Sequence, residues 1–114
     1  MTEAPKGAKP TIARIWRGRT TRERADEYSR YLHETGVPPL KEKALAVMQL
    51  REDRENETEF VTISFWASVE AMSAFAGKDP RRIHHLPRDP EFLIELPKTV
   101  QVMEITESKG LFGA

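Results

Sequence analysis

The sequence predicts an α+β protein whose elements run in the order strand, helix, strand, strand, helix, strand. Three observations lead to this prediction. Apolar residues alternate along four short stretches, as they do in half-buried strands. Between them lie two stretches with helical spacing, each preceded by a hydroxyl residue of the kind that caps a helix. A short charged turn at residues 53–57 joins the second and third strands, which favours an antiparallel pair.

The first strand is expected at residues 11–18, where Ile12, Arg14 and Trp16 share one face. Two interpretations of that face stay open. If it packs against a second copy of the chain, Trp16 is interface packing and Arg14 needs a carboxylate partner. If it faces the helices, Arg14 can bind a substrate carbonyl or enolate, and Trp16 can form a wall of the ligand site.

The first helix is expected to follow Thr20, because Glu23 three residues later completes a capping box. Tyr28 lies on the apolar stripe of this helix. It belongs either to the core, with its hydroxyl satisfied, or to a pocket in which it hydrogen-bonds a substrate oxygen. Gly36 and the two prolines after it are expected to end the helix.

The second and third strands are expected at residues 44–52 and 58–66. Trp66 closes the third strand, and it is either a core aromatic or a stacking surface for a planar ligand. A second helix, capped by Ser68, is expected to carry Phe75 on its apolar face and to end near residue 77.

The rest of the chain is less regular. Residues 78–90 contain three prolines and are expected to form a loop, with one short helical turn over residues 79–83. Residues 91–96 form a short amphipathic piece, and the last strand is expected at residues 99–106. This order of elements is that of the ferredoxin-like βαββαβ fold.

Both faces of the predicted strands carry apolar residues. In the ferredoxin-like fold the two helices cover one face of a four-stranded antiparallel sheet and leave the other face bare. A bare apolar face of that size is not left in water. We therefore expect a two-fold homodimer whose sheets pack face to face, which forms a dimeric α/β barrel.

Composition excludes several classes of partner and site. Eighteen basic and eighteen acidic residues cancel, so the net charge attracts neither nucleic acid nor an anionic membrane. The chain has no cysteine, which excludes disulfides and thiolate chemistry. No apolar run approaches the roughly 20 residues that span a bilayer. The expected location is the cytoplasm.

The two ends of the sequence differ from its centre. Residues 1–10 are polar and rich in proline and lysine, and they are expected to form a disordered arm without the apolar segment of a signal peptide. Residues 11–106 are expected to fold as one domain. Residues 107–114 are expected to be a flexible tail.

His84 and His85 are the first candidates for chemistry, because an imidazole exchanges a proton near neutral pH. Neighbouring residues of a helix point about 100° apart, so at most one of the two is expected to face a pocket. The arginines around them also fit a solvated basic loop. No set of histidines or carboxylates has the spacing of metal ligands, and no metal site is predicted.

The chain resembles the antibiotic biosynthesis monooxygenase-like family of dimeric α/β barrels over residues 11–106. The features that carry this resemblance are the first strand, the helix after Thr20, the block Phe65-Trp66-Ala67-Ser68 with Ala71 and Phe75, and the last apolar strand. The resemblance implies a ligand pocket between the sheet and the helices of each protomer. The family includes cofactor-independent monooxygenases of aromatic polyketides and quinols, haem-degrading monooxygenases, and members without known activity.

The function that this resemblance implies is that of a monooxygenase-like protein acting on a small aromatic or quinol-type substrate without a cofactor. In such chemistry the deprotonated substrate reacts with oxygen directly. The protein then needs an apolar pocket, a base and a donor to the developing oxyanion. The expected parts are walls from Trp66, Phe75 and Trp16, a base from His85 or His84, and an oxyanion partner from Arg14 or Tyr28.

Two alternatives remain. In the haem-degrading branch a strand-ending tryptophan, a second aromatic and an iron-ligating histidine occupy positions that match Trp66, Phe75 and His85, although that branch has asparagine on the first strand and tryptophan as the second aromatic. The other alternative is a non-catalytic dimeric protein that binds a small molecule. A ligand-sized cavity lined by a histidine favours the enzyme, whereas a cavity packed shut by Met48, Met72 and Phe75 favours the binding protein.

Overall fold

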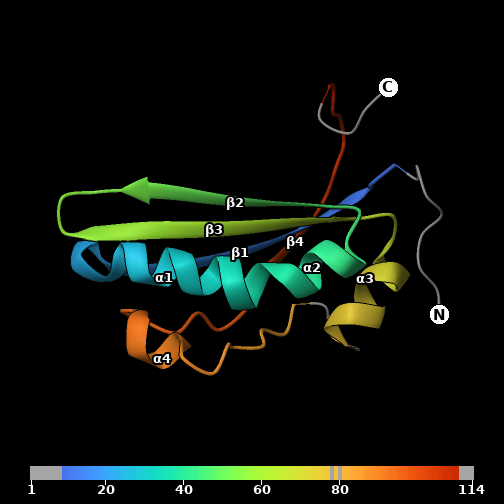
Figure 1. Ribbon diagram of the computed structural model, residues 1–114. Coiled ribbons are helices and arrows are strands. Elements are labelled where there is room, and N and C mark those ends of the chain that lie inside the picture. Colours follow the sequence, from blue (N-terminus) through green and yellow to red (C-terminus); the bar gives the residue numbers. More distant parts are fainter. Residues whose placement is uncertain (1–8, 78, 80, 111–114) are drawn as a thin grey trace.

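The computed structural model describes residues 9–77, 79 and 81–110, and it confirms the predicted α+β protomer (Figure 1). Its strands form one four-stranded antiparallel sheet in the order β2-β3-β1-β4. The elements are β1 (Ile12–Thr21), a 3-10 turn (Arg22–Arg24), α1 (Ala25–Tyr31), a π turn (Leu32–Gly36), α2 (Val37–Lys43), β2 (Ala46–Asp53), β3 (Glu57–Trp66), α3 (Val69–Ala76), α4 (Asp89–Phe92) and β4 (Gln101–Glu104).

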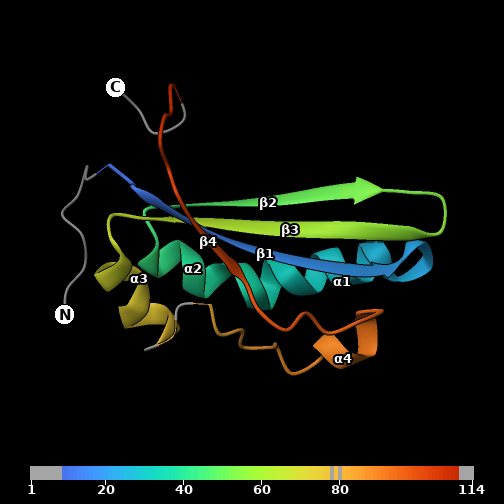
Figure 2. The same cartoon turned by 180° about the vertical axis from the view of Figure 1, so that it is seen from behind.

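The molecule has two layers. Seen from either side, α1, α2, α3 and α4 lie on one face of the sheet (Figures 1 and 2). The opposite face carries no element among the described residues. The pairing of β1 with both β3 and β4 places β1 in the interior of the sheet, so its side chains form the centre of both faces.

The register decides which residues face the helices. Arg14 pairs with Ser64, and Trp16 pairs with Thr62, which in turn pairs with Gln49 of β2. Residues directly opposite one another in an antiparallel pair point to the same face. Trp16 packs against the core cluster around Tyr28 of α1. The face of β1 that carries Arg14 and Trp16 is therefore the helix face, which decides between the two interpretations that the sequence left open.

The predicted capping box at Thr20 is wrong. β1 continues to Thr21, and Thr20 pairs with Thr58 inside the sheet, where it is fully buried. Its hydroxyl donates to the carbonyl of Thr21 at 2.9 Å instead of capping a helix. The longer strand prevails because pairing along β3 satisfies the backbone of these residues, and a local capping preference is the weaker effect.

The first helix does not end at Gly36, as the sequence predicted. Gly36 has helical dihedral angles (φ −83°, ψ −41°), and the chain passes through a π turn into α2. The amide of Val37 donates to the carbonyl of Leu32, which is the wider spacing of a π turn. The two prolines then occupy the first turn of α2, where their missing N–H groups are tolerated.

The other boundaries lie close to the predictions. Ser68 caps α3 by accepting a hydrogen bond from the amide of Ala71 at 3.1 Å, and Gly77 ends that helix with φ +92°. β2 and β3 lie within two residues of the predicted ranges, and β4 is shorter than predicted. The short helix α4 begins at Asp89, two residues before the predicted amphipathic piece.

The core lies at one end of the molecule, under α1 and α4. Tyr28 meets Phe60 edge to face at 5.3 Å between ring centroids, and Phe92 lies 5.1 Å from the same tyrosine ring. These rings pack with Ala25, Leu32 and Leu93, and the half-buried Trp16, Tyr31 and Leu86 lie against them. Aromatic pairs in this geometry stabilise a core beyond the area that they bury.

The predictions for the two ends of the chain fall mainly outside the described residues. Residues 1–8 of the expected arm and residues 111–114 of the expected tail belong to this undescribed part. Across the rest of the chain, no helix is both long and apolar enough to cross a bilayer.

Candidate functional site

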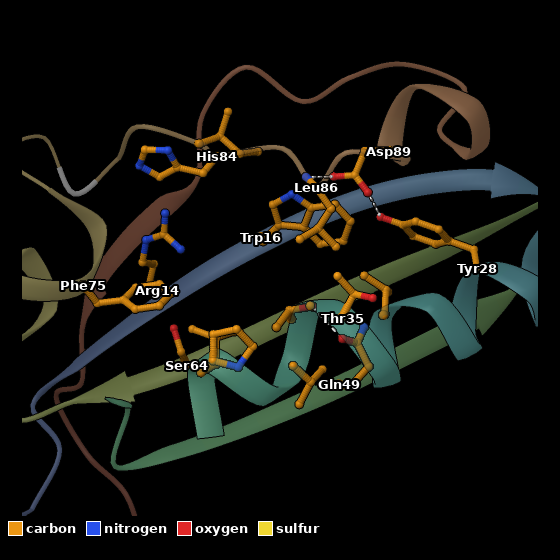
Figure 3. A pocket seen from close by; sticks show the side chains of 17 residues that line it. Arg14, Trp16, Tyr28, Thr35, Gln49, Ser64, Phe75, His84, Leu86 and Asp89 are labelled. Atoms are coloured by element: carbon orange, nitrogen blue, oxygen red, sulfur yellow. Dashed lines mark hydrogen bonds between the residues drawn. The ribbon is translucent and has the colours of Figure 1, made fainter. Parts of the chain in front are cut away.

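A pocket of about 360 Å³ lies between the sheet, the α1–α2 helix and the segment that precedes α4 (Figure 3). Its volume falls within the range of small-molecule sites. The residues that line it are Arg14, Trp16, Tyr28, Leu32, Thr35, Gly36, Val37, Pro39, Leu40, Gln49, Thr62, Ser64, Phe75, Ile83, His84, Leu86 and Asp89.

The floor of the pocket is the polar part of the sheet. Thr62 donates to Oε1 of Gln49 at 2.7 Å, and the amide nitrogen of Gln49 donates to the carbonyl of Val61 at 3.3 Å. The hydroxyl of Ser64 accepts from the indole N–H of Trp66 at 2.9 Å. A hydroxyl is both donor and acceptor, so Ser64 retains a proton that it can donate.

Arg14 brings a positive charge to this floor. Its Nη2 donates to the carbonyl of Arg82 at 3.0 Å, which ties β1 to the segment above the pocket. Burial lowers the pKa of Arg14 from its ordinary value, because a charged group loses hydration there. A guanidinium nevertheless stays charged in proteins and carries five N–H donors. Arg14 is therefore suited to bind an oxygen that carries negative charge.

His84 lies at the same end of the pocket as Arg14 and Phe75 (Figure 3). Its Nε2 is 3.3 Å from the carbonyl oxygen of Ala76. A carbonyl only accepts, so Nε2 carries the hydrogen, and in the neutral ring Nδ1 is then the acceptor. His85 is exposed and does not line the pocket. The structure thus brings one of the two predicted histidines to the site.

Tyr28 lines the opposite end of the pocket from Arg14 (Figure 3). Its hydroxyl donates to Oδ1 of Asp89 at 2.9 Å, and Oδ2 of Asp89 accepts from the amide of Leu86 at 2.9 Å. Burial, followed by the charge and hydrogen bond of Asp89, raises the pKa of Tyr28 far above its ordinary value. The phenolic proton is thus held by Asp89, and between the two predicted oxyanion partners Arg14 is the better placed donor.

The three predicted aromatic walls have different positions. Trp16 and Phe75 line the pocket, and Phe75 is 36% exposed. Trp66 is only 2% exposed and lies behind Phe75, with 5.5 Å between the ring centroids. Trp66 therefore supports Phe75 and Ser64 from the interior without lining the pocket itself.

The sequence analysis missed several polar residues of the site, chiefly Gln49, Thr62, Ser64 and Asp89. A signal for two of them was present, since Thr62 and Ser64 alternate with apolar residues along β3 and must share one sheet face. Two hydroxyl residues on the helix-facing side of a central strand are unusual for a closed core. Asp89 had no comparable signal, because one partner of its side chain is the hydroxyl of Tyr28, which is remote in sequence, and the other is the local backbone amide of Leu86.

The structure of this chain is similar to a solved structure of another protein. Over 90% of this chain and 99% of the other, the structure superposes with a TM-score of 0.63 on the crystal structure of a putative antibiotic biosynthesis monooxygenase from Bacillus cereus. The chain has an antibiotic biosynthesis monooxygenase-like fold. The two sequences are 14% identical, so the likeness concerns the fold alone. No family model and no curated protein matches this chain.

The haem-degrading alternative of the sequence analysis assigns the iron ligand to His85, and the structure does not favour that assignment. The expected ligand His85 is exposed and lies outside the pocket lining. His84 lines the pocket but directs Nε2 to the carbonyl of Ala76. The histidine that the resemblance assigns to haem iron therefore does not line this pocket. Among the described residues no group of three or more histidines or carboxylates can hold a metal ion.

Proposed function

We propose that this protein is a small monooxygenase-like protein that oxygenates an aromatic or quinol-type substrate without a cofactor. The observation that carries the proposal is the pairing of Arg14 with His84 at one end of a pocket whose walls are aromatic and aliphatic. Arg14 donates to the carbonyl of Arg82, two residues before His84, and His84 is bonded to the carbonyl of Ala76, next to Phe75. The pocket thus combines a cation and a base beside a flat apolar surface.

The substrate ring would lie between Trp16 and Phe75, which flank the pocket on β1 and α3. Aromatic rings favour such stacked or tilted contacts. Its hydroxyl would point to the Arg14 end, because a phenolate is stabilised there by a charge-assisted hydrogen bond. Gln49, Thr62 and Ser64 on the floor are then available to orient a second oxygen of the substrate.

The chemistry begins with removal of a phenolic proton by Nδ1 of His84. Arg14 stabilises the phenolate, which shares its negative charge with a ring carbon. That carbon forms a bond to O₂, and cleavage of the O–O bond leaves one oxygen atom on the ring and releases the other as water. For 1,4-dihydroxynaphthalene, one O₂ gives 2-hydroxy-1,4-naphthoquinone and one water. The ring loses the four electrons that reduce O₂, so no outside reductant is needed.

Oxygen uptake with 1,4-dihydroxynaphthalene under ¹⁸O₂ tests the proposal. Monooxygenation puts one ¹⁸O atom into the hydroxyquinone, whereas spontaneous oxidation gives unlabelled naphthoquinone and hydrogen peroxide. We expect labelled product from the wild-type protein and a loss of about a hundredfold in kcat for Arg14→Met, the loss typical of a missing oxyanion donor. Binding without labelled product would instead favour the non-catalytic alternative.

The pocket is not filled by the protein's own side chains, which supports the binding of a ligand there. Of the three side chains that would have packed it shut, Met48 points to the opposite sheet face and Met72 is fully buried away from the lining. Phe75 lines the pocket without closing it. A cavity of this size lined by a histidine supports an enzyme over a protein whose pocket is filled by its own side chains.

We also propose that the protein acts as a homodimer through the bare sheet face. By register, the residues of that face alternate with those of the pocket floor and include Ile15, Met48, Leu50, Ile63 and Met103. Leu50 is 44% and Met103 is 52% exposed in the protomer. A sheet face with such residues is stabilised by packing on an identical copy. Sedimentation velocity should show a dimer for the wild type and a monomer for Leu50→Glu, while Lys41→Glu on the exposed surface of α2, in the helix layer, serves as a charge control.

A further inference from the structure

Gly18 lies on β1 two residues after Trp16 and on the same sheet face. A Cβ atom built at this position would be 2.5 Å from Cη2 and 2.8 Å from Cζ2 of Trp16. Such distances are far below van der Waals contact. The six-membered ring of the indole therefore lies directly over the Gly18 backbone and occupies the space that any other side chain would fill.

The indole of Trp16 lies between the two ends of the pocket and also packs against the core. On one side it lines the pocket, and on the other it packs against the core cluster around Tyr28 and Phe92. Figure 3 shows it between the Arg14 and His84 end and the Tyr28 and Asp89 end. Cδ2 of Leu93 lies 3.1 Å from the same Cβ position, so the core also fills the space beside Gly18.

We propose that Gly18 sets the space available in the ligand pocket, because the absence of a side chain at this position lets the Trp16 indole lie against β1. Gly18 is a positioning residue, since it does not line the pocket and acts through Trp16. The inference rests on the proposed function only in taking this pocket as the ligand site. A methyl group at position 18 would lift the indole off β1 and into the space between the sheet and the helices, where the ligand is expected to bind.

The Gly18→Ala variant tests this inference, and Trp16→Phe provides its rescue. Phenylalanine lacks the Cη2 and Cζ2 atoms that the new methyl group would meet, so the double variant should not suffer the clash. Calorimetric titration with 1-hydroxy-2-naphthoate, an anionic aromatic probe, measures affinity. We expect Gly18→Ala to weaken binding about tenfold, and the same change made in the Trp16→Phe background to alter binding less than about twofold.

A second measurement follows the indole itself and needs no ligand. In the Trp66→Phe background Trp16 is the sole tryptophan, since the chain has two. Displacement toward the pocket should increase quenching of its fluorescence by acrylamide when Gly18→Ala is added. Circular dichroism of each variant checks that the sheet is retained.

Three results would overturn the inference. They are an unchanged Trp16 quenching in Gly18→Ala, unchanged affinity for the probe in that variant, or an equal loss of affinity with and without Trp16→Phe. The last result would mean that Gly18 acts through its own backbone. If the wild-type protein does not bind the probe at all, the proposed function loses its support, while the quenching measurement still decides whether Gly18 positions the indole.

Discussion

Replacing Tyr28 by phenylalanine should destabilise the protein by an amount that can be worked out from one hydrogen bond. The Tyr28 side chain is fully buried, and its hydroxyl donates at 2.9 Å to Asp89, which is 2% exposed. The change removes a single oxygen atom and leaves the ring contacts with Phe60 and Phe92 in place. The dominant effect is therefore the loss of a donor to a buried carboxylate.

A hydrogen bond to a charged group contributes about 1.5–3 kcal/mol, and a buried acceptor left with fewer donors has no water to replace it. The other oxygen of Asp89 keeps its bond to the amide of Leu86, which holds the loss within that range. For a domain of this size, each kcal/mol lowers Tm by about 4 °C. We expect Tyr28→Phe to lower Tm by roughly 6–12 °C.

Tyr31→Phe is the matched control for this prediction. Its hydroxyl accepts from the amide of Arg88 at 2.9 Å, in a bond exposed to solvent, so water can replace it when the hydroxyl is lost. We expect a loss of less than about 1 kcal/mol for Tyr31→Phe. Urea unfolding followed by circular dichroism, at one protein concentration because association would add stability, compares the two variants. Equal losses in the two variants would refute the assignment of a charged, buried hydrogen bond to Tyr28.

Three further predictions concern catalysis, helix capping and pH. His84→Asn should lower kcat for oxygen uptake by about 10²–10⁴-fold, as for a lost general base, whereas the equally exposed His85→Asn should leave it unchanged. Ser68→Ala should lower the free energy of unfolding by about 1 kcal/mol in urea, because Ser68 caps α3. The folded state holds the Tyr28 proton more tightly than the unfolded state, whose pKa is near 10.0, so stability should be full below that pH and fall above it. The free energy of unfolding should fall by up to about 1.4 kcal/mol per pH unit in the wild type and by less in Tyr28→Phe. An identical pH profile in the two proteins would contradict this prediction.

The order of elements was predictable because each strand and helix has its own local pattern. Ser68 and Gly77 delimit α3 by side-chain capping and by a positive φ, which are properties of single residues. Thr20 was misassigned because its partner Thr58 is remote in sequence, and a capping preference of about 1 kcal/mol is smaller than the gain from strand pairing. Gly36 was misassigned because a π turn lets the helix continue, and no local rule indicates where such a turn forms.

The site residues, like the secondary structure, were predictable where a local pattern marks them and not where a remote contact decides. Periodicity placed Arg14 and Trp16 on one face, but only the packing of Trp16 against the core around Tyr28 showed that this face is covered by helices. The choice between His84 and His85 depended on how a proline-rich segment returns over the sheet, and the deciding contact is to the carbonyl of Ala76. Asp89 escaped notice because a lone carboxylate gains its meaning from Tyr28, 61 positions earlier in the chain.

The polar floor explains why the pocket stays open. If the α1–α2 helix closed onto the sheet, it would cover Gln49, Thr62 and Ser64, whose mutual and backbone hydrogen bonds would gain nothing from apolar contact. It would also bring the charged Arg14 into a drier environment, at a cost in hydration. Apolar burial, which closes an ordinary core, therefore provides little force for collapse at this end. Under the proposed function, a ligand with an aromatic ring and at least one oxygen would suit both halves of such a site, because its ring would pack on Trp16 and its oxygen would accept a hydrogen bond from Arg14.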